Sequence, residues 1–259
     1  MIRIWNTVAD WRERRRTLAG RSIGFVPTMG ALHRGHASLV ERCRQENEIV
    51  VVSIFVNPTQ FNDPKDLRRY PRTLDSDLAL LESLQADDIL VPNSSDLYPN
   101  VDRFRVEPDD SSRTMEGAFR PGYLQGVLTV VLKLLNIVEP DRTYFGEKDY
   151  QQLKVITDMV HEFFLSTKIV PCPTVRDNLG LAESSRNALL SAEYRKKAAQ
   201  LFRVLKTAAD PTEARTILEA EGFAVEYIEE RWGRRLVAAS LEGVRLIDNI
   251  PMGTCASHT

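Results

Sequence analysis

Hydrophobic runs alternate with amphipathic stretches through the first two thirds of the chain. Residues 50–56, Val-Val-Val-Ser-Ile-Phe-Val, are apolar at nearly every position, which is typical of a central strand buried on both faces. Shorter apolar runs predict further strands, and apolar residues at helical spacing predict helices between them. We expect strands at 23–26, 49–56, 89–91, 143–145 and 168–170, and helices at 37–48, 75–84, 125–138 and 150–164.

This alternation predicts an α/β fold, a doubly wound Rossmann-like parallel sheet with helices on both faces. The pattern changes after Pro171-Cys-Pro173. Beyond it we expect helices at 191–209 and 212–221 and strands at 224–230, 236–240 and 244–248, which predict a smaller α+β domain with an antiparallel sheet. The expected domains are residues 1–173 and 174–259.

Composition narrows the class of protein. Hydrophobic residues make up 43% of the 259 positions, enough for a substantial core, and the formal charge of −2 gives no overall attraction to nucleic acid or to an anionic membrane. The longest strongly apolar segment, 127–138, is too short to cross a bilayer, and the first residues lack the pattern of a secretion signal. We therefore expect a cytoplasmic protein without nucleic-acid or membrane partners. The basic run 14–16 favours a solvated helix face, with a phosphate contact as the alternative.

The cysteines and two of the histidines suggest no chemistry. Cys43, Cys172 and Cys255 are odd in number, widely spaced and without a Cys-x-x-Cys pair, so neither a disulfide framework nor a zinc site is expected. A reducing compartment fits this usage best. His161 lies within a helical pattern and His258 near the end of the chain, and we expect both to be structural.

The other two histidines lie in Phe25-Val-Pro-Thr-Met-Gly-Ala-Leu-His-Arg-Gly-His36, between a predicted strand and a predicted helix. Open α/β sheets bind ligands at the carboxyl ends of their strands. Gly30 and Gly35 let a phosphate approach the backbone, and a helix amino terminus supplies N–H donors. Although a single histidine is more often structural, His33 and His36 can face one bound group together. The pair favours nucleoside triphosphate chemistry.

Two further polar segments also follow predicted strands. The carboxamides in Asn57-Pro-Thr-Gln60 can hold a carboxylate or a hydroxyl without adding charge. Lys148 can meet a phosphate, Asp149 can bind a ribose hydroxyl, and Gln152 lies one helical turn after Lys148. Ordinary turns are the alternative for both segments. A doubly wound sheet brings the ends of these strands to one crevice, so their shared placement favours one site.

Two later motifs are more ambiguous. Ser184-Ser-Arg-Asn187 combines two hydroxyls and a guanidinium, which suits a mobile loop that closes on triphosphate oxygens; a helix N-cap is the alternative. Arg120-Pro-Gly-Tyr123 introduces an apolar helix. Val127 and Val130 of that helix could line a small-molecule pocket, but core packing is the expected role of most of its residues.

Together these motifs resemble the pantothenate synthetase (pantoate–β-alanine ligase) family of nucleotidyltransferases, whose His-x-Gly-His is similar to the signature of class I aminoacyl-tRNA synthetases. The resemblance runs almost from end to end, through 25–36, 53–61, 70–73, 120–122, 145–152, 184–187 and 245–249. It implies an ATP-dependent ligase that condenses pantoate with β-alanine to pantothenate through a pantoyl adenylate, releasing AMP and pyrophosphate. It also implies Mg²⁺ bound with the triphosphate, and a homodimer.

The resemblance implies roles for individual residues as well. His36 is expected to be the catalytic histidine, with His33 and Lys148 beside it, and no protein ligand to a metal is expected. Residues 174–259 are expected to form a lid on the nucleotide- and pantoate-binding domain. Pantoate contacts are implied for Gln60 and Gln152, with Asn57 and Met29 beside them. ATP contacts are implied for Met29, Gly30, Ala31, Leu32, His33, Arg34, Gly35, His36, Gly146, Glu147, Lys148, Asp149, Val175 through its backbone, Glu183, Ser184, Ser185 and Arg186.

Three residues depart from the family's pattern. Leu179 replaces a common Asp, Glu183 occupies a usually apolar position, and Tyr123 stands where His is frequent. A carboxylate beside a triphosphate is unfavourable unless it turns away or helps to bind the metal. We therefore expect that these departures, if they have an effect, alter ATP handling and leave the fold unchanged. Two alternatives stay open. One is a nucleotidyltransferase with another acceptor, against which the 57–60 segment and Gln152 argue, and the other is a non-enzymatic nucleotide-binding module.

Overall fold

The computed structural model describes residues 2–100 and 103–252, so Cys255 and His258 lie outside the described residues. The chain divides into two compact units. The first contains Met1–Glu147 and Gln151–Pro173, and the second contains Lys148–Tyr150 and Thr174–Thr259. The chain therefore enters the second unit twice, once for three residues and once after Pro173.

The first unit is built on a six-stranded sheet with the order β1-β4-β3-β2-β5-β6, in which all neighbouring strands are parallel. Strand β3 (Ile49–Ile54) is buried at every residue, as its apolar run predicts. The strand order reverses between β2 (Ile23–Thr28) and β5 (Arg142–Gly146), where a doubly wound sheet opens a crevice. The predicted doubly wound α/β fold is confirmed. The remaining strands are β1 (Arg3–Trp5), β4 (Asp88–Leu90) and β6 (Lys168–Cys172).

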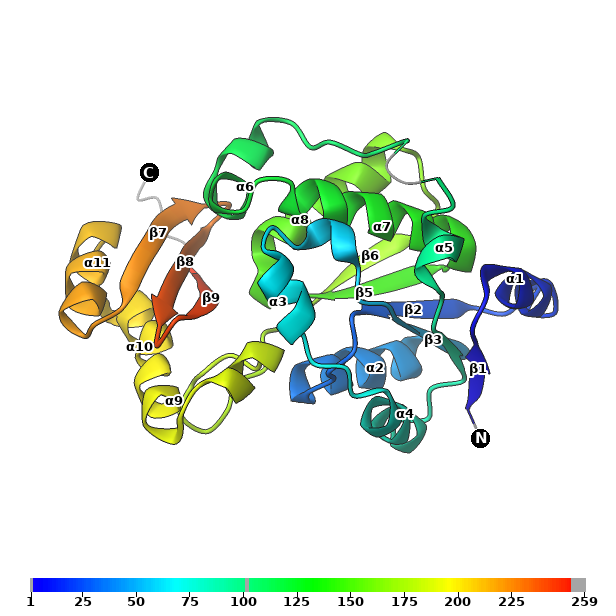
Figure 1. Cartoon of the computed structure of the whole chain (residues 1–259), viewed down its shortest axis with the longest axis horizontal. Coiled ribbons are helices and arrows are strands. Elements are labelled where there is room, and N and C mark those ends of the chain that lie inside the picture. Colours follow the sequence, from blue (N-terminus) through cyan, green and yellow to red (C-terminus); the bar gives the residue numbers. More distant parts are fainter. Residues whose placement is uncertain (1, 101–102, 253–259) are drawn as a thin grey trace, which may run out of the picture. The chain divides into compact units, whose positions relative to one another are not determined.

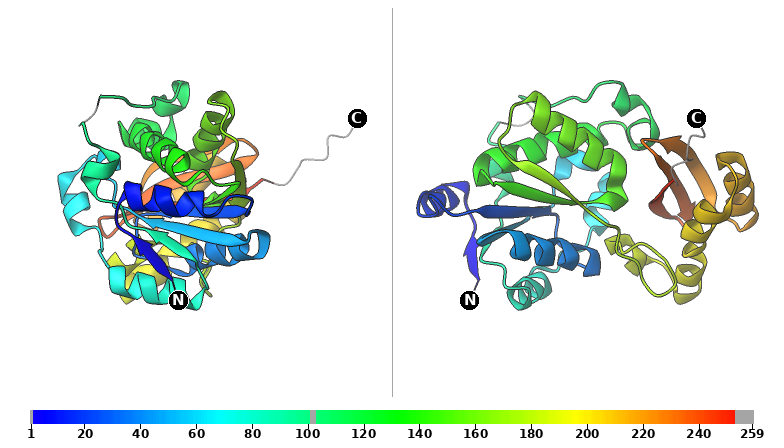
Figure 2. Two further views of the ribbon diagram at one scale, coloured as in Figure 1. Left: turned by 90° about the vertical axis from the view of Figure 1, so that its right-hand side faces the viewer. Right: turned by 180° about the vertical axis from the view of Figure 1, so that it is seen from behind.

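Helices cover both faces of this sheet (Figure 1). α2 (Arg34–Glu46) and α4 (Leu74–Ser83) lie on one face, and α7 (Tyr123–Val138) and α8 (Tyr150–Glu162) lie on the other. Figure 2 shows the same layers from behind. Val40 of α2 and Leu81 of α4 share one apolar core with Val52 of β3. Shorter helices of this part of the chain are α1 (Val8–Arg16), α3 (Pro64–Arg69), α5 (Ser94–Leu97), α6 (Met115–Phe119), and the 3-10 helices η1 (Pro58–Gln60), η2 (Asp110–Arg113) and η3 (Glu147–Asp149).

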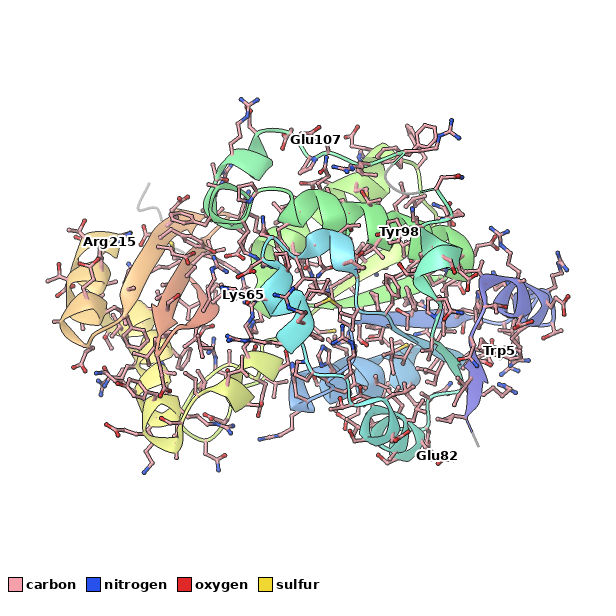
Figure 3. All side chains as sticks on the ribbon, viewed as in Figure 1. Trp5, Lys65, Glu82, Tyr98, Glu107 and Arg215 are labelled. Carbon is pink, nitrogen blue, oxygen red and sulfur yellow. The ribbon has the colours of Figure 1, made fainter. Side chains whose placement is uncertain are left out.

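Strand β1 was not among the expected elements, and a buried carboxylate holds it in place. Asp88 of β4 is fully buried, and its Oδ1 accepts hydrogen bonds from Arg3 Nε and Trp5 Nε1, both at 2.9 Å. Trp5 is labelled in Figure 3. Arg14 Nη2 of α1 donates to Asp88 Oδ2 at 3.1 Å. The carboxylate of Asp88 therefore links strand β1 and helix α1 to the edge of the sheet.

The basic run 14–16 is only partly solvated, so the expected solvated helix face is corrected. Arg14 pairs with the buried Asp88, and Arg15 Nε donates to the carbonyl of Val138 at 3.1 Å. Arg16 alone of the three is exposed. Long side chains can cover apolar surface and still reach an acceptor. A run of charged residues therefore does not by itself indicate that their side chains are exposed to solvent.

The second unit contains the antiparallel sheet β7-β8-β9, as the sequence predicts. Apolar residues of α10 (Gln200–Thr207) and α11 (Pro211–Ala220) form a core with the sheet. Arg215 of α11, labelled in Figure 3, donates to the carbonyl of Val225 at 2.9 Å and so fastens this helix to β7. The strands are β7 (Ala224–Arg231), β8 (Arg234–Leu241) and β9 (Val244–Pro251).

The single helix expected at 191–209 is two helices. α9 (Ala192–Ala198) ends at Ala198, Ala199 is the cap residue between the two helices, and α10 begins at Gln200. The N–H of Ala199 bonds to the carbonyl of Lys197 rather than to the one four residues earlier, so the helical ladder is interrupted there. The apolar residues keep helical spacing across Ala199, so the sequence pattern does not reveal this break.

The remaining expectations concern thiols, His161 and membranes. Cys43 and Cys172 are free, buried thiols, and burial raises the pKa of Cys43 to about 12 and that of Cys172 to about 11. His161 is exposed in the last turn of α8. In the ranges that the structure describes, we find no helix with the length and apolar character needed to span a membrane.

Candidate functional site

In the first unit, two segments of the expected site directly follow neighbouring strands, at the same edge of the sheet. β2 and β3 are paired in parallel register up to their last residues, and β5 is the other neighbour of β2. The His33–His36 loop follows β2, and the Asn57–Gln60 turn follows β3. β5 ends at Gly146, Glu147 comes next, and Gln152 lies in the first turn of α8. The topology thus brings the loop after β2 and the turn after β3 side by side.

His33 and His36 cap α2 with their own rings. Nδ1 of His33 accepts from the N–H of Gly35 at 3.1 Å, and Nδ1 of His36 accepts from the N–H of His33 at 3.3 Å. Because each Nδ1 is an acceptor, the hydrogen of each neutral ring is on Nε2. The ring centroids are 4.1 Å apart. The adjacent rings therefore carry two Nε2–H donors at a helix amino terminus, an arrangement suited to phosphate oxygens.

A buried aspartate supports the loop before these histidines. Asp77 of α4 is 3% exposed, and its two oxygens accept from the N–H groups of Ala31 at 3.0 Å and Leu32 at 2.8 Å. Gly30 has a φ of +78°, and a Cβ there would lie 3.0 Å from Asp77 Oδ2. Asp77 was not among the predicted site residues. Its only signal was a carboxylate four residues before the buried Leu81 on a predicted helix.

The carboxamide of Asn57 is saturated by protein groups and orients Gln60. Asn57 Nδ2 donates to Gln60 Oε1 at 3.0 Å and to the carbonyl of Gly126 at 3.2 Å. Its Oδ1 accepts from the hydroxyl of Tyr98 at 2.8 Å, and Tyr98 is labelled in Figure 3. Asn57 and Gln60 are both buried. With Gln60 Oε1 engaged by Asn57, the NH₂ end of Gln60 is directed away from Asn57.

Gln152 is held in the same way by another residue. The hydroxyl of Tyr123 donates to Gln152 Oε1 at 2.8 Å, and Tyr123 is buried. The guanidinium carbon of Arg120 lies 3.5 Å from the centroid of the Tyr123 ring. The carboxamide oxygen of Gln152 is thus engaged, and its NH₂ end is directed away from Tyr123. No contact with Gln152 was predicted for Tyr123.

One turn of α7 carries both sets of contacts. Tyr123 reaches Gln152, and Gly126, three residues later, lies directly against η1. A Cβ at Gly126 would come 2.5 Å from the carbonyl oxygen of Thr59, so only a glycine allows this approach. Since both contacts start from the same helical turn, Gln60 and Gln152 are held at the same end of the first unit. Val127 and Val130, on the same helix, are buried in the core.

Lys148 and Asp149 follow the end of β5, yet their segment groups with the second unit. The Lys148 carbonyl accepts from Asn249 Nδ2 of β9 at 2.9 Å. Arg234 Nη1 donates to Asn249 Oδ1 at 2.6 Å, and the guanidinium carbon of Arg234 lies 4.3 Å from the ring centroid of Tyr150. The Lys148 ammonium is 3.6 Å from the Asp149 carboxylate. Asn249 was not among the predicted site residues, because no local sequence pattern pairs it with Lys148.

The segment from Val175 to Glu183 folds into a tight hairpin in the second unit. The N–H of Glu183 bonds to the carbonyl of Val175 at 2.9 Å, and the half-buried side chain of Glu183 follows this strand pair. Asp177 Oδ1 accepts from the N–H of Leu179 at 2.9 Å and stabilises the turn. Leu179 is exposed at the tip. The exposed tip of the hairpin therefore accommodates Leu179 without burying it.

Ser184 begins a short 3-10 helix. Its hydroxyl accepts from the N–H of Arg186 at 3.3 Å and so caps η4 (Ser185–Leu189). Ser185 and Arg186 are half-buried, and Asn187 is buried with its Nδ2 donating to the carbonyl of Ala182 at 2.9 Å. The segment thus has the local N-cap that was the alternative to a phosphate-binding loop. Hydroxyl and guanidinium groups, such as those of Ser185 and Arg186, are of the kinds that bind phosphate oxygens.

Known proteins resemble this chain over nearly its whole length. The pantoate-beta-alanine ligase family model matches residues 3–251. A pantothenate synthetase of Bdellovibrio bacteriovorus is 49% identical over 250 residues, which cover 96% of this chain and 99% of that protein. A pantoate-beta-alanine ligase structure from Francisella tularensis, complexed with beta-gamma ATP and beta-alanine, has a TM-score of 0.93 and 41% identity, covering 97% of this chain and 98% of that one. A pantothenate synthetase structure from Thermus thermophilus has a TM-score of 0.87 and 42% identity, covering 96% and 99%. The chain belongs to the pantoate-beta-alanine ligase family.

Proposed function

We propose that this chain is an ATP-dependent ligase that joins pantoate to β-alanine and so forms pantothenate. The family match supports this function, and the Francisella relative binds an ATP compound and β-alanine. One observation carries the proposal at the level of geometry. The paired imidazoles of His33 and His36 and the carboxamide of Gln60 follow neighbouring strands at the same edge of the sheet.

The reaction needs two steps. The pantoate carboxylate attacks the α-phosphorus of ATP, an O–P bond forms, and the bond to pyrophosphate breaks. The amine of β-alanine then attacks the carbonyl carbon of pantoyl adenylate, loses a proton and expels AMP. Neither step requires a covalent bond to the protein.

Hydrogen-bond donors on the His33–His36 loop are proposed to stabilise the triphosphate. The Nε2–H groups of both histidines would strengthen their bonds as charge builds on the phosphate oxygens in the transition state. The Lys148 ammonium would offset part of the same charge. We assign ATP contacts to 29–36, 146–149, the backbone of 175, and 183–186, and we expect the 184–186 segment to keep water from the adenylate.

The two glutamines are proposed to hold the pantoate carboxylate in line with phosphorus. Gln60 and Gln152 each have an engaged Oε1, so each offers its NH₂ group to an anion. Fixed orientation of the reacting groups supplies a large part of the rate enhancement in such reactions. Both hydrogens of Asn57 are already used, so we assign Asn57 to the support of Gln60, with Met29 bordering the carboxylate.

Magnesium is proposed to enter as a complex with ATP. Mg²⁺ is commonly held by one or two carboxylates together with substrate phosphates and water. Within the described part of the chain, no group of three or more His, Cys, Asp or Glu side chains is placed to hold a metal ion. Glu183 either turns away from this complex or contributes one carboxylate to it. We further propose that the protein works in the cytoplasm as a homodimer, and light scattering in solution tests the assembly.

The proposed function is tested by following the two steps separately. Purified protein is incubated with ATP, Mg²⁺ and pantoate, and we expect pyrophosphate release and pantoyl adenylate by mass spectrometry. Added β-alanine should yield the amide and AMP. The Gln60→Ala variant should lose the pantoate-dependent step while it still binds ATP.

Two results would contradict the proposed function. ATP binding without pantoate-dependent pyrophosphate exchange would indicate a nucleotide-binding module. Pyrophosphate release with another acceptor but not with pantoate would indicate a different nucleotidyltransferase.

A further inference from the structure

We propose that Tyr123 is a positioning residue that sets the carboxamide of Gln152 with its NH₂ group toward the carboxylate of the substrate. The inference rests on the proposed function and deepens it, because it assigns a task to a residue that departs from the family's pattern. Tyr123 acts through Gln152 and has no assigned contact with the reacting atoms.

The orientation of Gln152 follows from one hydrogen bond. A carboxamide has one acceptor end and one donor end, and the two are interchangeable by a half turn of the group. The hydroxyl of Tyr123 donates to Oε1 of Gln152 at 2.8 Å, so Oε1 is the end of the carboxamide that faces the tyrosine in this structure. The Tyr123 side chain is 5% exposed, so the hydroxyl cannot move away without disturbing the packing around it.

Tyr123 is itself held by a short series of contacts. The guanidinium carbon of Arg120 lies 3.5 Å from the centroid of the tyrosine ring, and Arg120 Nη1 lies 3.3 Å from Oε2 of the buried Glu116. The N–H of Glu116 donates to Oε1 of Gln151 at 2.9 Å, which ties the residue before Gln152 to the same place. Both ends of the Tyr123–Gln152 bond are thus fixed before a substrate arrives.

Gln60 is oriented in the same way as Gln152, and the two together indicate what kind of group they bind. Gln60 Oε1 accepts from Asn57, so both glutamines have their oxygens engaged by protein donors. A carboxylate binds N–H groups and is repelled by a carbonyl oxygen. Two amides whose NH₂ ends are preset as donors therefore favour a carboxylate, and the bond from Tyr123 holds Gln152 in that orientation.

A double-mutant cycle tests whether Tyr123 acts through Gln152. Tyr123→Phe keeps the ring and the Arg120 contact and removes only the hydroxyl. We expect it to raise the KM for pantoate about fivefold, the effect of one hydrogen bond, and to leave the KM for ATP unchanged. In a Gln152→Ala background the same change should have no further effect, because the group to be positioned is gone. Equal losses in both backgrounds would overturn the proposal.

A second readout needs no turnover. In protein labelled with ¹⁵N-glutamine, the NH₂ signals of Gln152 are assigned by their loss in Gln152→Ala. We expect them to become more mobile in Tyr123→Phe and to respond less to pantoate. Tyr144→Phe is the control for general destabilisation, since it removes another hydroxyl, one that bonds to Asn47 and Glu46.

The outcomes separate the two proposals. Unchanged mobility of the Gln152 amide in Tyr123→Phe would overturn the positioning role, whatever the activity. Absence of pantoate-dependent pyrophosphate release in the wild type would instead overturn the proposed function, and the amide signals would still decide the role of Tyr123.

Discussion

The two ring nitrogens of His36 have separate roles, and different substitutions can test each role separately. Nδ1 caps α2, and Nε2 carries the donor that we assign to ATP. His36→Asn places an amide oxygen near the position of Nδ1 and removes the Nε2 donor. We expect turnover to fall roughly 10²–10³-fold with little change in Tm, measured by pyrophosphate release and thermal unfolding.

His36→Gln is the matched control. Its amide nitrogen can reach the position of Nε2, but it offers no acceptor for the N–H of His33. It should lower Tm more and turnover less than His36→Asn does. The reverse ranking, or a His36→Asn enzyme within about tenfold of wild-type activity, would contradict the assignment.

Individual residues also show where sequence analysis stops. The histidines and glutamines were found because they follow apolar runs that predict strands, and their roles stay predictions. Asp77 and the bond from Tyr123 to Gln152 were not found, because these contacts join positions 45 and 29 apart in the chain. A local pattern does not specify such a partner.

Among the secondary-structure elements, boundaries and short strands were the least predictable. The helix expected from residue 37 begins at Arg34, because His33 supplies its cap. The three residues of β1 have no usable period, and the strand depends on pairing with β4 and on Asp88. By contrast, β3 was evident because burial on both faces demands an unbroken apolar run.

The contact of η1 with α7 depends on a missing side chain at Gly126. In Gly126→Ala the new Cβ would lie 2.5 Å from the carbonyl oxygen of Thr59, so η1 and Gln60 must shift. Helix propensity alone would make alanine stabilising by about 1 kcal/mol. We expect a net loss of about 1–3 kcal/mol in unfolding free energy and a raised KM for pantoate.

Initial rates and urea unfolding measure these effects. Gln125→Ala, on the same turn, should change neither quantity. A folded Gly126→Ala protein with the wild-type KM for pantoate would show that the position of η1 is unimportant for this substrate.

The link between β1 and β4 should make stability depend on pH at the acid end. Burial raises the pKa of Asp88, but hydrogen bonds from Arg14, Arg3 and Trp5 outweigh burial and bring the pKa below its usual value. A carboxyl group with a lowered folded-state pKa stabilises the protein above its unfolded pKa of about 3.9, and this contribution is lost as the pH falls through the folded pKa.

Asp88→Asn should therefore cost about 3 kcal/mol of unfolding free energy at about pH 7, because two guanidinium groups lose their counter-charge. The difference from wild type should shrink as the pH falls below about 4. Urea unfolding over a pH series measures it. A difference that stays constant to the lowest pH at which both proteins fold would contradict the ionic role of Asp88.

At the scale of the whole molecule, the segment 148–150 makes its anchoring contacts within the second unit. Asn249→Asp keeps an acceptor for Arg234 and removes the donor to the Lys148 carbonyl. We expect the KM for ATP to rise about fivefold and the KM for pantoate to stay unchanged, since one hydrogen bond is lost near the proposed phosphate ligand.

Steady-state rates with each substrate varied in turn provide the measurement. Glu226→Gln is the control, because it weakens another ion pair of the same sheet, the one with Arg245. An equal rise in both KM values would indicate a general disturbance rather than a displaced Lys148.

The alternation of strands and helices was enough to predict a parallel sheet followed by a smaller antiparallel one. It was not enough to show that residues 148–150 belong with the smaller sheet. Their local pattern, a strand followed by a helix start, is the same as at β2. Contacts with Asn249, Arg234 and Trp232, which are distant in the sequence, distinguish them.

This double entry of the chain into the second unit constrains how family members can be recombined. If residues 174–252 are exchanged for the corresponding part of a relative, residues 148–150 still come from the original protein. They must then pack against contact residues that come from the relative. A hybrid enzyme should therefore inherit 148–150 and 174–252 from the same parent, although 23 residues of the other parent separate the two grafts.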